Sequence, residues 1–207
     1  MPTPEFFYFD LGNVLLKFDH QLAARQMGEV AGLDAQRVWD VVFDSGLELR
    51  YEAGEVDDAA FYEEFCKLTD TRSDRDALLL AGSAIFTPNY SILPIVAGLQ
   101  LANCRLGILS NTCTAHWRYC IDGRYPILNT AFNVYALSYE LGAVKPSPKI
   151  FAGAAKLAGV APEKIFFVDD IAGHVAGAQA AGFDAVQYTS APALAAELRQ
   201  RGLEFNY

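Results

Sequence analysis

Short, continuously apolar segments alternate with longer amphipathic ones along most of this chain. The apolar segments lie at residues 5–10, 104–110, 132–137, 165–169 and, more weakly, 184–188. They lack the alternation of a half-exposed strand, so we interpret them as central strands covered on both faces. Helical patterns lie at residues 91–102, 147–158, 174–181 and 193–201. This order predicts an α/β fold, a doubly wound parallel sheet with helices on both faces.

The stretch between residues 17 and 85 has a different pattern. It shows helical periodicity at residues 21–30, 35–43, 57–68 and 74–85, and no convincing strand. A segment of this length is too long for an ordinary connection between neighbouring strands. We therefore predict a discontinuous core formed by residues 1–16 and 86–207, interrupted by an inserted α-helical cap at residues 17–85.

Polar side chains stand where the predicted strands end. They are Asp10 after the first strand, Ser110 and Asn111 after the second, Lys145 in the loop after the third, and Asp169 and Asp170 after the fourth. In an open parallel sheet, ligands bind outside the carboxyl ends of the strands. We therefore expect these side chains to converge on one crevice.

The residue types in this crevice favour phosphate chemistry. Asp10 is suited to act as a nucleophile that forms a covalent aspartyl-phosphate. Attack by an anion on an anionic phosphate needs compensating charge, which Mg²⁺ held by Asp10 and Asp170 (or Asp169) supplies. Lys145 adds a point positive charge.

Four short motifs carry a family resemblance. They read Phe-Asp-Leu-Gly-Asn-Val-Leu at 9–15, Ile-Leu-Ser-Asn-Thr at 108–112, Lys-Pro at 145–146 and Phe-Val-Asp-Asp at 167–170. Each motif alone is weak, but their order at successive strand ends is specific. The chain resembles a haloacid dehalogenase superfamily hydrolase with a helical cap. It is also similar to the sugar-phosphate phosphatases of that superfamily whose first motif reads FDLGNV.

The resemblance implies a role for each strand-end residue. Asp10 is implied as nucleophile and metal ligand, with the Gly12 carbonyl and the acidic pair Asp169 and Asp170, chiefly Asp170, as further metal ligands. The groups implied to bind the phosphoryl oxygens are Ser110, Asn111, Lys145 and the backbone N–H groups after Asp10, at Gly12 and Asn13. Lys145 is also implied to pair with Asp10 or Asp169.

Gly12 departs from the family pattern, which usually has a second aspartate two positions after the nucleophile as general acid and base. General acid catalysis typically supplies about 10²–10⁴-fold. The departure is compatible with slow turnover, with substrates that have good leaving groups, or with a substitute acid. The candidates for a substitute acid are His116, His20, Tyr51 and Glu52.

Three functions fit this sequence. The first is a Mg²⁺-dependent phosphatase acting on a small phosphorylated metabolite such as a sugar phosphate, through an aspartyl-phosphate on Asp10. The second is a metal-free haloacid dehalogenase in which Asp10 attacks carbon, against which the pair Asp169 and Asp170 argues. The third is a catalytically weak protein that binds a phosphorylated ligand or partner, which Gly12 motivates.

Composition excludes several broad classes of protein. The 207 residues carry 25 acidic and 16 basic side chains, a formal net charge of −9, which argues against nucleic-acid binding. An apolar share of 52% excludes a wholly disordered chain. Because no apolar run suggests a membrane span and no secretory signal or paired cysteine motif is visible, we expect a cytoplasmic monomer or homodimer.

Overall fold

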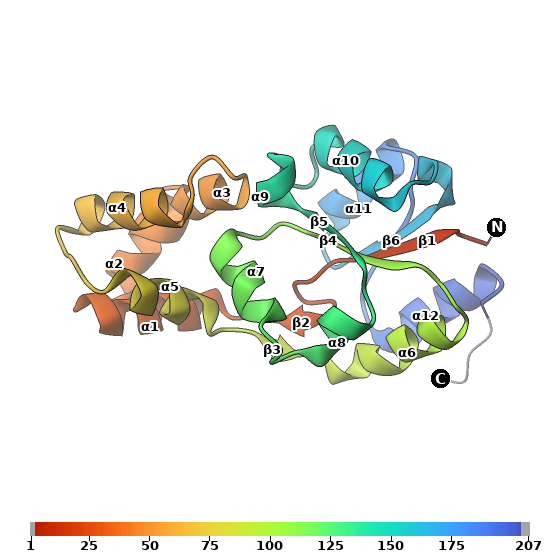
Figure 1. Cartoon of the computed structure of the whole chain (residues 1–207), viewed down its shortest axis with the longest axis horizontal. Helices are drawn as coiled ribbons and strands as arrows, with labels where there is room; N and C mark the ends of the chain where they lie inside the picture. Colours follow the sequence, from red (N-terminus) through yellow and green to blue (C-terminus); the bar gives the residue numbers. More distant parts are fainter. Residues whose placement is uncertain (1–2, 204–207) are drawn as a thin grey trace.

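The sheet has the predicted parallel architecture. A computed structural model describes residues 3–203, so the ends of the predicted core, residues 1–2 and 204–207, lie outside the described residues. Five parallel strands form one sheet in the order β5-β4-β1-β6-β7 (Figure 1). They are β1 (Phe6–Phe9), β4 (Leu106–Ser110), β5 (Val134–Leu137), β6 (Ile165–Asp169) and β7 (Asp184–Gln187). Each strand lies inside the segment predicted for it, and the α/β fold is confirmed.

Helices cover both faces of this sheet (Figure 1). One face carries α10 (Pro148–Ala158) and α11 (Ala172–Ala180), and the other carries α6 (Leu93–Leu101) and α12 (Ala191–Gln200). In β1, Phe6 and Tyr8 pack on the first face, while Phe7 and Phe9 pack on the second. All four side chains are at most 1% exposed, which explains why β1 is apolar throughout.

Local signals set the ends of helix α10, which follows the loop that carries Lys145. The Ser147 side chain accepts a hydrogen bond from the Lys149 backbone N–H, and Pro148 occupies the first turn. Gly159 ends the helix with a φ of 67°, in the left-handed region. The predicted start and stop of this helix are therefore confirmed.

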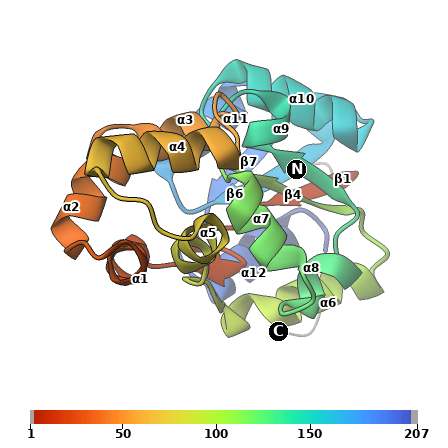
Figure 2. The same ribbon diagram turned by 60° about the vertical axis from the view of Figure 1, so that its left-hand side comes forward.

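A second group of helices lies to one side of the sheet (Figures 1 and 2). It consists of α1 (His20–Ala31), α2 (Ala35–Trp39), a π-helical turn (Asp40–Asp44), α3 (Leu47–Glu52), α4 (Asp58–Thr69) and α5 (Arg75–Ser83). These helices share a hydrophobic cluster of their own. The chain enters and leaves the group through a two-stranded antiparallel pair, β2 (Leu16–Lys17) with β3 (Thr87–Pro88). We propose that this helical group is the cap.

Several short elements differ from the sequence pattern. The predicted helix at 35–43 ends at Trp39 and continues as the π-helical turn, and α3 lies where no helix was predicted. The connections of the core add α7 (Thr114–Ile121), α8 (Pro126–Thr130), α9 (Ser138–Leu141) and short 3₁₀ turns at Tyr90–Ile92 and Pro162–Lys164. None of the helices within residues 3–203 combines the length and apolar character needed to span a bilayer.

Candidate active site

The ends of β1 and β6 bring Asp10 and Asp169 to the two sides of one lysine. Lys145 Nζ lies 2.8 Å from Asp10 Oδ1 and 2.6 Å from Asp169 Oδ2. It also donates to the Leu109 carbonyl oxygen at 3.2 Å. The three charged residues are 3%, 6% and 0% exposed for Lys145, Asp10 and Asp169. Because β1 and β6 are adjacent parallel strands, the sheet itself creates this triad.

The second predicted motif positions the loop that carries Lys145. The Asn111 side-chain amide donates to the Lys145 carbonyl oxygen at 3.2 Å and accepts from the Lys145 backbone N–H at 2.7 Å. Both ends of the Asn111 amide are therefore engaged with the backbone of this loop. The Ser110 hydroxyl donates to the Asn111 carbonyl oxygen at 3.1 Å and lies in the same cavity as Asp10.

One buried cation faces two buried carboxyls, and the two carboxyls differ in their partners. Burial would raise the pKa of Asp169, but hydrogen bonds from His174, Lys145 and the Ile171 backbone N–H lower that pKa to about 2. Burial raises the pKa of Asp10 to about 7, although Lys145 acts to lower it. Asp169 is thus the fully compensated partner, whereas Lys145 offsets only part of the effect of burial on Asp10.

Asp170 completes a cluster of carboxylates that fits a divalent cation. Oxygen atoms of Asp10, Asp169 and Asp170 lie within 4.8 Å of one another. The oxygens of Asp169 are already engaged with Lys145 and His174, while Asp170 is partly exposed and accepts one hydrogen bond from Asn13 Nδ2 at 3.0 Å. Oxygen donors of this kind are the ligands that Mg²⁺ prefers. Asp10 and Asp170 are therefore the two carboxylates most open to a metal ion.

An aromatic ring lies where a side chain at position 12 would project. A Cβ atom built on Gly12 would lie 2.7 Å from Phe18 Cε1. An aspartate at this position would therefore have to displace the Phe18 ring. The departure from the family pattern is thus built into the packing of the site, and sequence alone gave no sign of the Phe18 contact.

A cavity of about 270 Å³ lies over these residues. Its floor includes Asp10, Gly12, Asn13, Ser110, Asn111, Lys145 and Asp170. The remaining lining includes Phe18, His20, Glu52, Phe86, His116 and His174. Of the four candidate acids, Tyr51 does not line this cavity, and its hydroxyl donates to Asp58 instead. Phe18 and Phe86 are additions to the predicted site, and neither belongs to a recognisable motif.

A family model of haloacid dehalogenase-like hydrolases matches residues 7–182. The chain belongs to this family. The match spans every strand-end residue of the site, from Asp10 to Asp170, and confirms the resemblance that the four motifs indicate.

Known haloacid dehalogenase-like proteins include relatives of similar length. A D-ribitol-5-phosphate phosphatase of Bacteroides thetaiotaomicron is 25% identical over 187 residues, covering 86% of this chain and 89% of the relative. A family enzyme of the same organism, solved with magnesium and inorganic phosphate, superposes with a TM-score of 0.79 at 22% identity, covering 90% and 95% of the two chains. The L-2-haloacid dehalogenase of Xanthobacter autotrophicus gives 0.64 at 24% identity, covering 95% and 83%.

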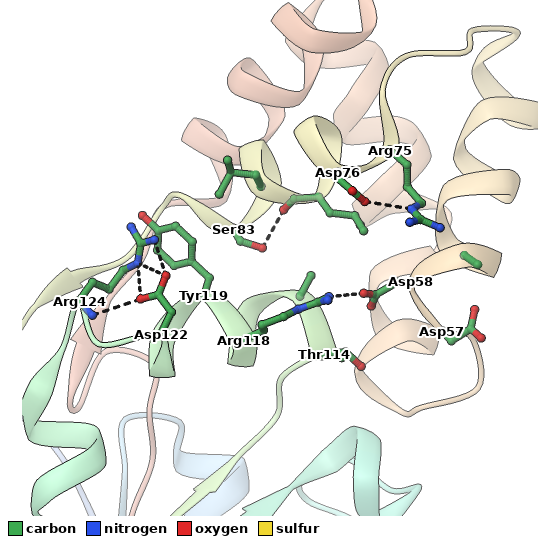
Figure 3. A pocket seen from close by; sticks show the side chains of 14 residues that line it. Asp57, Asp58, Arg75, Asp76, Ser83, Thr114, Arg118, Tyr119, Asp122 and Arg124 are labelled. Atoms are coloured by element: carbon green, nitrogen blue, oxygen red, sulfur yellow. Dashed lines mark hydrogen bonds and ion pairs between the residues drawn. The ribbon is translucent and has the colours of Figure 1, made fainter.

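This haloacid dehalogenase-like hydrolase also has a larger cleft, of about 490 Å³, between α4, α5 and α7. Each arginine that lines the cleft is paired with an aspartate of the same cleft, as Figure 3 shows for Arg118 with Asp58. Arg124 pairs with Asp122 at 2.6 Å in the same way. The cleft contains none of the strand-end residues, so it is not the candidate active site.

Proposed function

We propose that this protein is a Mg²⁺-dependent phosphatase that hydrolyses a small phosphorylated metabolite through an aspartyl-phosphate on Asp10. The observation that carries the proposal is the buried Asp10 carboxylate, bonded to Lys145 and grouped with Asp170, at the carboxyl edge of the sheet. The relative named as a D-ribitol-5-phosphate phosphatase supports a sugar or sugar-alcohol phosphate as the substrate class.

The surroundings of Asp10 suit a nucleophile. Its Oδ1 atom accepts hydrogen bonds from the Leu11 backbone N–H at 2.7 Å and from Lys145, which fixes the orientation of the carboxylate. Within residues 3–203, no hydrogen bond is made to Oδ2, which we therefore assign as the attacking oxygen. Pre-alignment of this kind lowers the entropic part of the barrier.

The phosphoryl group would be held by the core side of the cavity. Lys145 and the Ser110 hydroxyl supply side-chain donors, and the backbone N–H of Gly12 lies in the turn after Asp10. The backbone N–H of Asn13, also expected as a donor, instead donates to the Leu16 carbonyl oxygen at 2.7 Å. Mg²⁺, bound by Asp10, Asp170 and the Gly12 carbonyl oxygen, would supply the charge compensation that phosphoryl transfer needs. These local groups offset the field of a protein whose net charge of −9 repels anionic substrates.

The test is hydrolysis of p-nitrophenyl phosphate and of D-ribitol 5-phosphate with added Mg²⁺, with EDTA, and with Asp10→Asn. We expect Mg²⁺-dependent phosphate release that EDTA and the substitution each abolish. Activity that survives Asp10→Asn would contradict the mechanism. Halide release from a 2-haloalkanoate that is indifferent to EDTA would favour the dehalogenase alternative.

A further inference from the structure

The proposed reaction needs a proton donor that the first motif does not supply. When the P–O bond to an alcohol breaks, the departing oxygen needs a proton, and Gly12 has no side chain to give one. The Phe18 ring occupies the space beside Gly12, so the donor must be another residue that lines the cavity. This inference rests on the proposed function, because it concerns the leaving group of that reaction.

We propose that Glu52, on the cap, is the general acid and base of the phosphatase reaction. Glu52 is the last residue of α3 and lines the same cavity as Asp10, Gly12 and Lys145. Within residues 3–203, its carboxyl makes no hydrogen bond or ion pair with another side chain or with the backbone. The carboxyl is therefore available to a substrate in the cavity.

The segment that follows Glu52 is fitted closely to the core. Gly54 has a φ of 72°, and a Cβ atom there would lie 2.3 Å from the Tyr139 carbonyl oxygen of α9. A residue with a side chain would be strained at this φ and would push the cap away from the core. The hydroxyl of Tyr51, next to Glu52, bonds Asp58, which in turn pairs with Arg118 of α7. These contacts hold the end of α3 against α7 and α9 of the core.

Three histidines line the cavity, and His174 is engaged with Asp169, with Nδ1 3.1 Å from Oδ1. The other two are weaker candidates than Glu52. His20 Nε2 lies 3.5 Å from Glu48 Oε1, and its ring packs between Phe18 and Phe43 with centroid distances of 4.7 and 4.8 Å. Burial and the neighbouring His116 lower the pKa of His20 to about 4, so its ring is neutral near pH 7. His116 packs edge-on against Phe86, with ring centroids 5.4 Å apart.

Burial, rather than the surrounding charges, favours a protonated carboxyl at Glu52. Burial raises the pKa of Glu52, while His116 of α7 and Lys145 of the core act to lower it. Glu48, one turn earlier on α3, has its pKa raised to about 8 by burial and by Glu52. Two neighbouring carboxyls that share one apolar site resist ionisation together. Burial therefore shifts Glu52 towards the protonated form, from which a general acid donates.

The proton balance closes over two steps. In the first step, an Asp10 oxygen forms a bond to phosphorus, the bond to the substrate oxygen breaks, and Glu52 gives its proton to that oxygen. In the second step, the Glu52 carboxylate takes a proton from water as the water oxygen attacks phosphorus. The bond from phosphorus to Asp10 then breaks, which releases inorganic phosphate and restores both carboxyl groups.

The experiment compares two leaving groups in the full-length Glu52→Gln variant. β-Glycerol phosphate releases an alkoxide that needs a proton, whereas p-nitrophenyl phosphate releases a stable anion. We expect kcat/KM for β-glycerol phosphate to fall by about 10²–10⁴-fold, and that for p-nitrophenyl phosphate by less than about tenfold. Because water activation also loses its base, stopped-flow mixing of the variant with p-nitrophenyl phosphate should show a burst of p-nitrophenolate.

Glu55→Gln is the matched control, because Glu55 lies three residues further on and its side chain is 63% exposed beside Arg50. We expect it to keep both kcat/KM values within about twofold of wild type, as for other exposed substitutions.

Equal losses on the two substrates in Glu52→Gln, or no loss on β-glycerol phosphate, would overturn the assignment. If the wild type hydrolyses both substrates and Asp10→Asn hydrolyses neither, such a result overturns the role of Glu52 alone. A wild type inactive on both substrates with Mg²⁺ overturns the proposed function as well.

Discussion

Two buried carboxyl groups near the candidate catalytic cavity, Asp169 on its core side and Glu48 on its cap side, have pKa values shifted in opposite directions. On the core wall, Asp169 is surrounded by donors from Lys145, His174 and the backbone, and its pKa lies near 2 despite burial. On the cap wall, burial raises the pKa of Glu48 to about 8 and also raises the pKa of Glu52. Asp169 of the core therefore stays charged, whereas burial favours the protonated form at Glu48 and Glu52 of the cap, as it does at Asp10.

The cause of this difference is local structure. A buried carboxylate is stable only where hydrogen bonds and a cation replace its hydration. The carboxyl ends of β1 and β6 provide free backbone N–H groups and lie beside Lys145. Glu52 instead lies in the last turn of α3, where exposed carbonyl groups disfavour negative charge. The cavity is thus lined on its core side by Asp10, which a backbone N–H and Lys145 contact, and on its cap side by Glu52, whose pKa burial raises.

Removing the nucleophile should give the largest effect. We expect Asp10→Asn to lower kcat by roughly 10⁴–10⁶-fold, the range seen when a nucleophile is removed from an intact site. Lys145 keeps its ion pair with Asp169 in this variant, so the protein should remain folded. Phosphate release gives the first quantity, and a urea unfolding curve the second. A variant that is both inactive and unfolded would not support a purely chemical role for Asp10.

Removing the Lys145 ammonium group, which pairs with both Asp10 and Asp169, should destabilise the core side of the cavity. We expect Lys145→Met to reduce the free energy of unfolding by about 3–5 kcal/mol, because it leaves two buried carboxyls without a cation. The double variant Lys145→Met with Asp169→Asn removes one of these charges and should recover part of the loss. Urea unfolding at pH 7 measures both variants. Equal stability of the single and double variants would show that Asp169 does not depend on Lys145.

The core wall was predictable from sequence, whereas the cap wall was not. Asp10 and Asp169 end short apolar strands, and the parallel topology then fixes their convergence. Helix α3 was missed because it has only six residues and its N-cap residue, Gly46, has no side chain to cap it. Phe18 reaches Gly12 through the folded turn between them, a contact that no periodicity encodes. Glu52 could be named as a candidate, but its place opposite Asp10 depends on how the helical group packs on the core.

The raised pKa of Glu48 should make the free energy of unfolding depend on pH. Since the pKa of Glu48 is about 8 in the folded protein and near 4.5 when unfolded, folding binds a proton between these values. The contribution of Glu48 to the free energy of unfolding is therefore fully present below about pH 4.5 and is lost as the pH rises towards 8. His20, His116 and Glu52 face the same carboxyl.

The variant that isolates this effect is Glu48→Gln, which cannot ionise. We expect it to exceed the wild type in free energy of unfolding by roughly 2–4 kcal/mol near pH 9, and by much less near pH 5. Urea unfolding across this pH range makes the comparison, with Glu55→Gln as an exposed control. A constant difference at all pH values would show that Glu48 contributes packing alone.

The smallest effect should come from the ion pair between Arg118 and Asp58, which connects the core to the cap. Arg118 of α7 pairs with Asp58 of α4 across the cleft in Figure 3, and its side chain is 64% exposed. An exposed pair of this kind contributes about 0.2–1 kcal/mol, so Arg118→Ala should change the free energy of unfolding by no more than that. Because Asp58 also bonds Tyr51, we expect kcat/KM for β-glycerol phosphate to fall by about two- to fivefold, in line with that energy.

Arg75→Ala provides the matched control for this prediction. Arg75 lines the same cleft but pairs with Asp76 of its own helix, at 3.1 Å, so its removal cuts no link between cap and core. High salt screens exposed pairs and should lower the wild-type kcat/KM towards that of Arg118→Ala, while the variant itself responds less. If the two arginine variants behave alike, the Arg118 pair does not position the cap wall. The placement of Glu52 would then depend on the close fit of Gly54 against Tyr139.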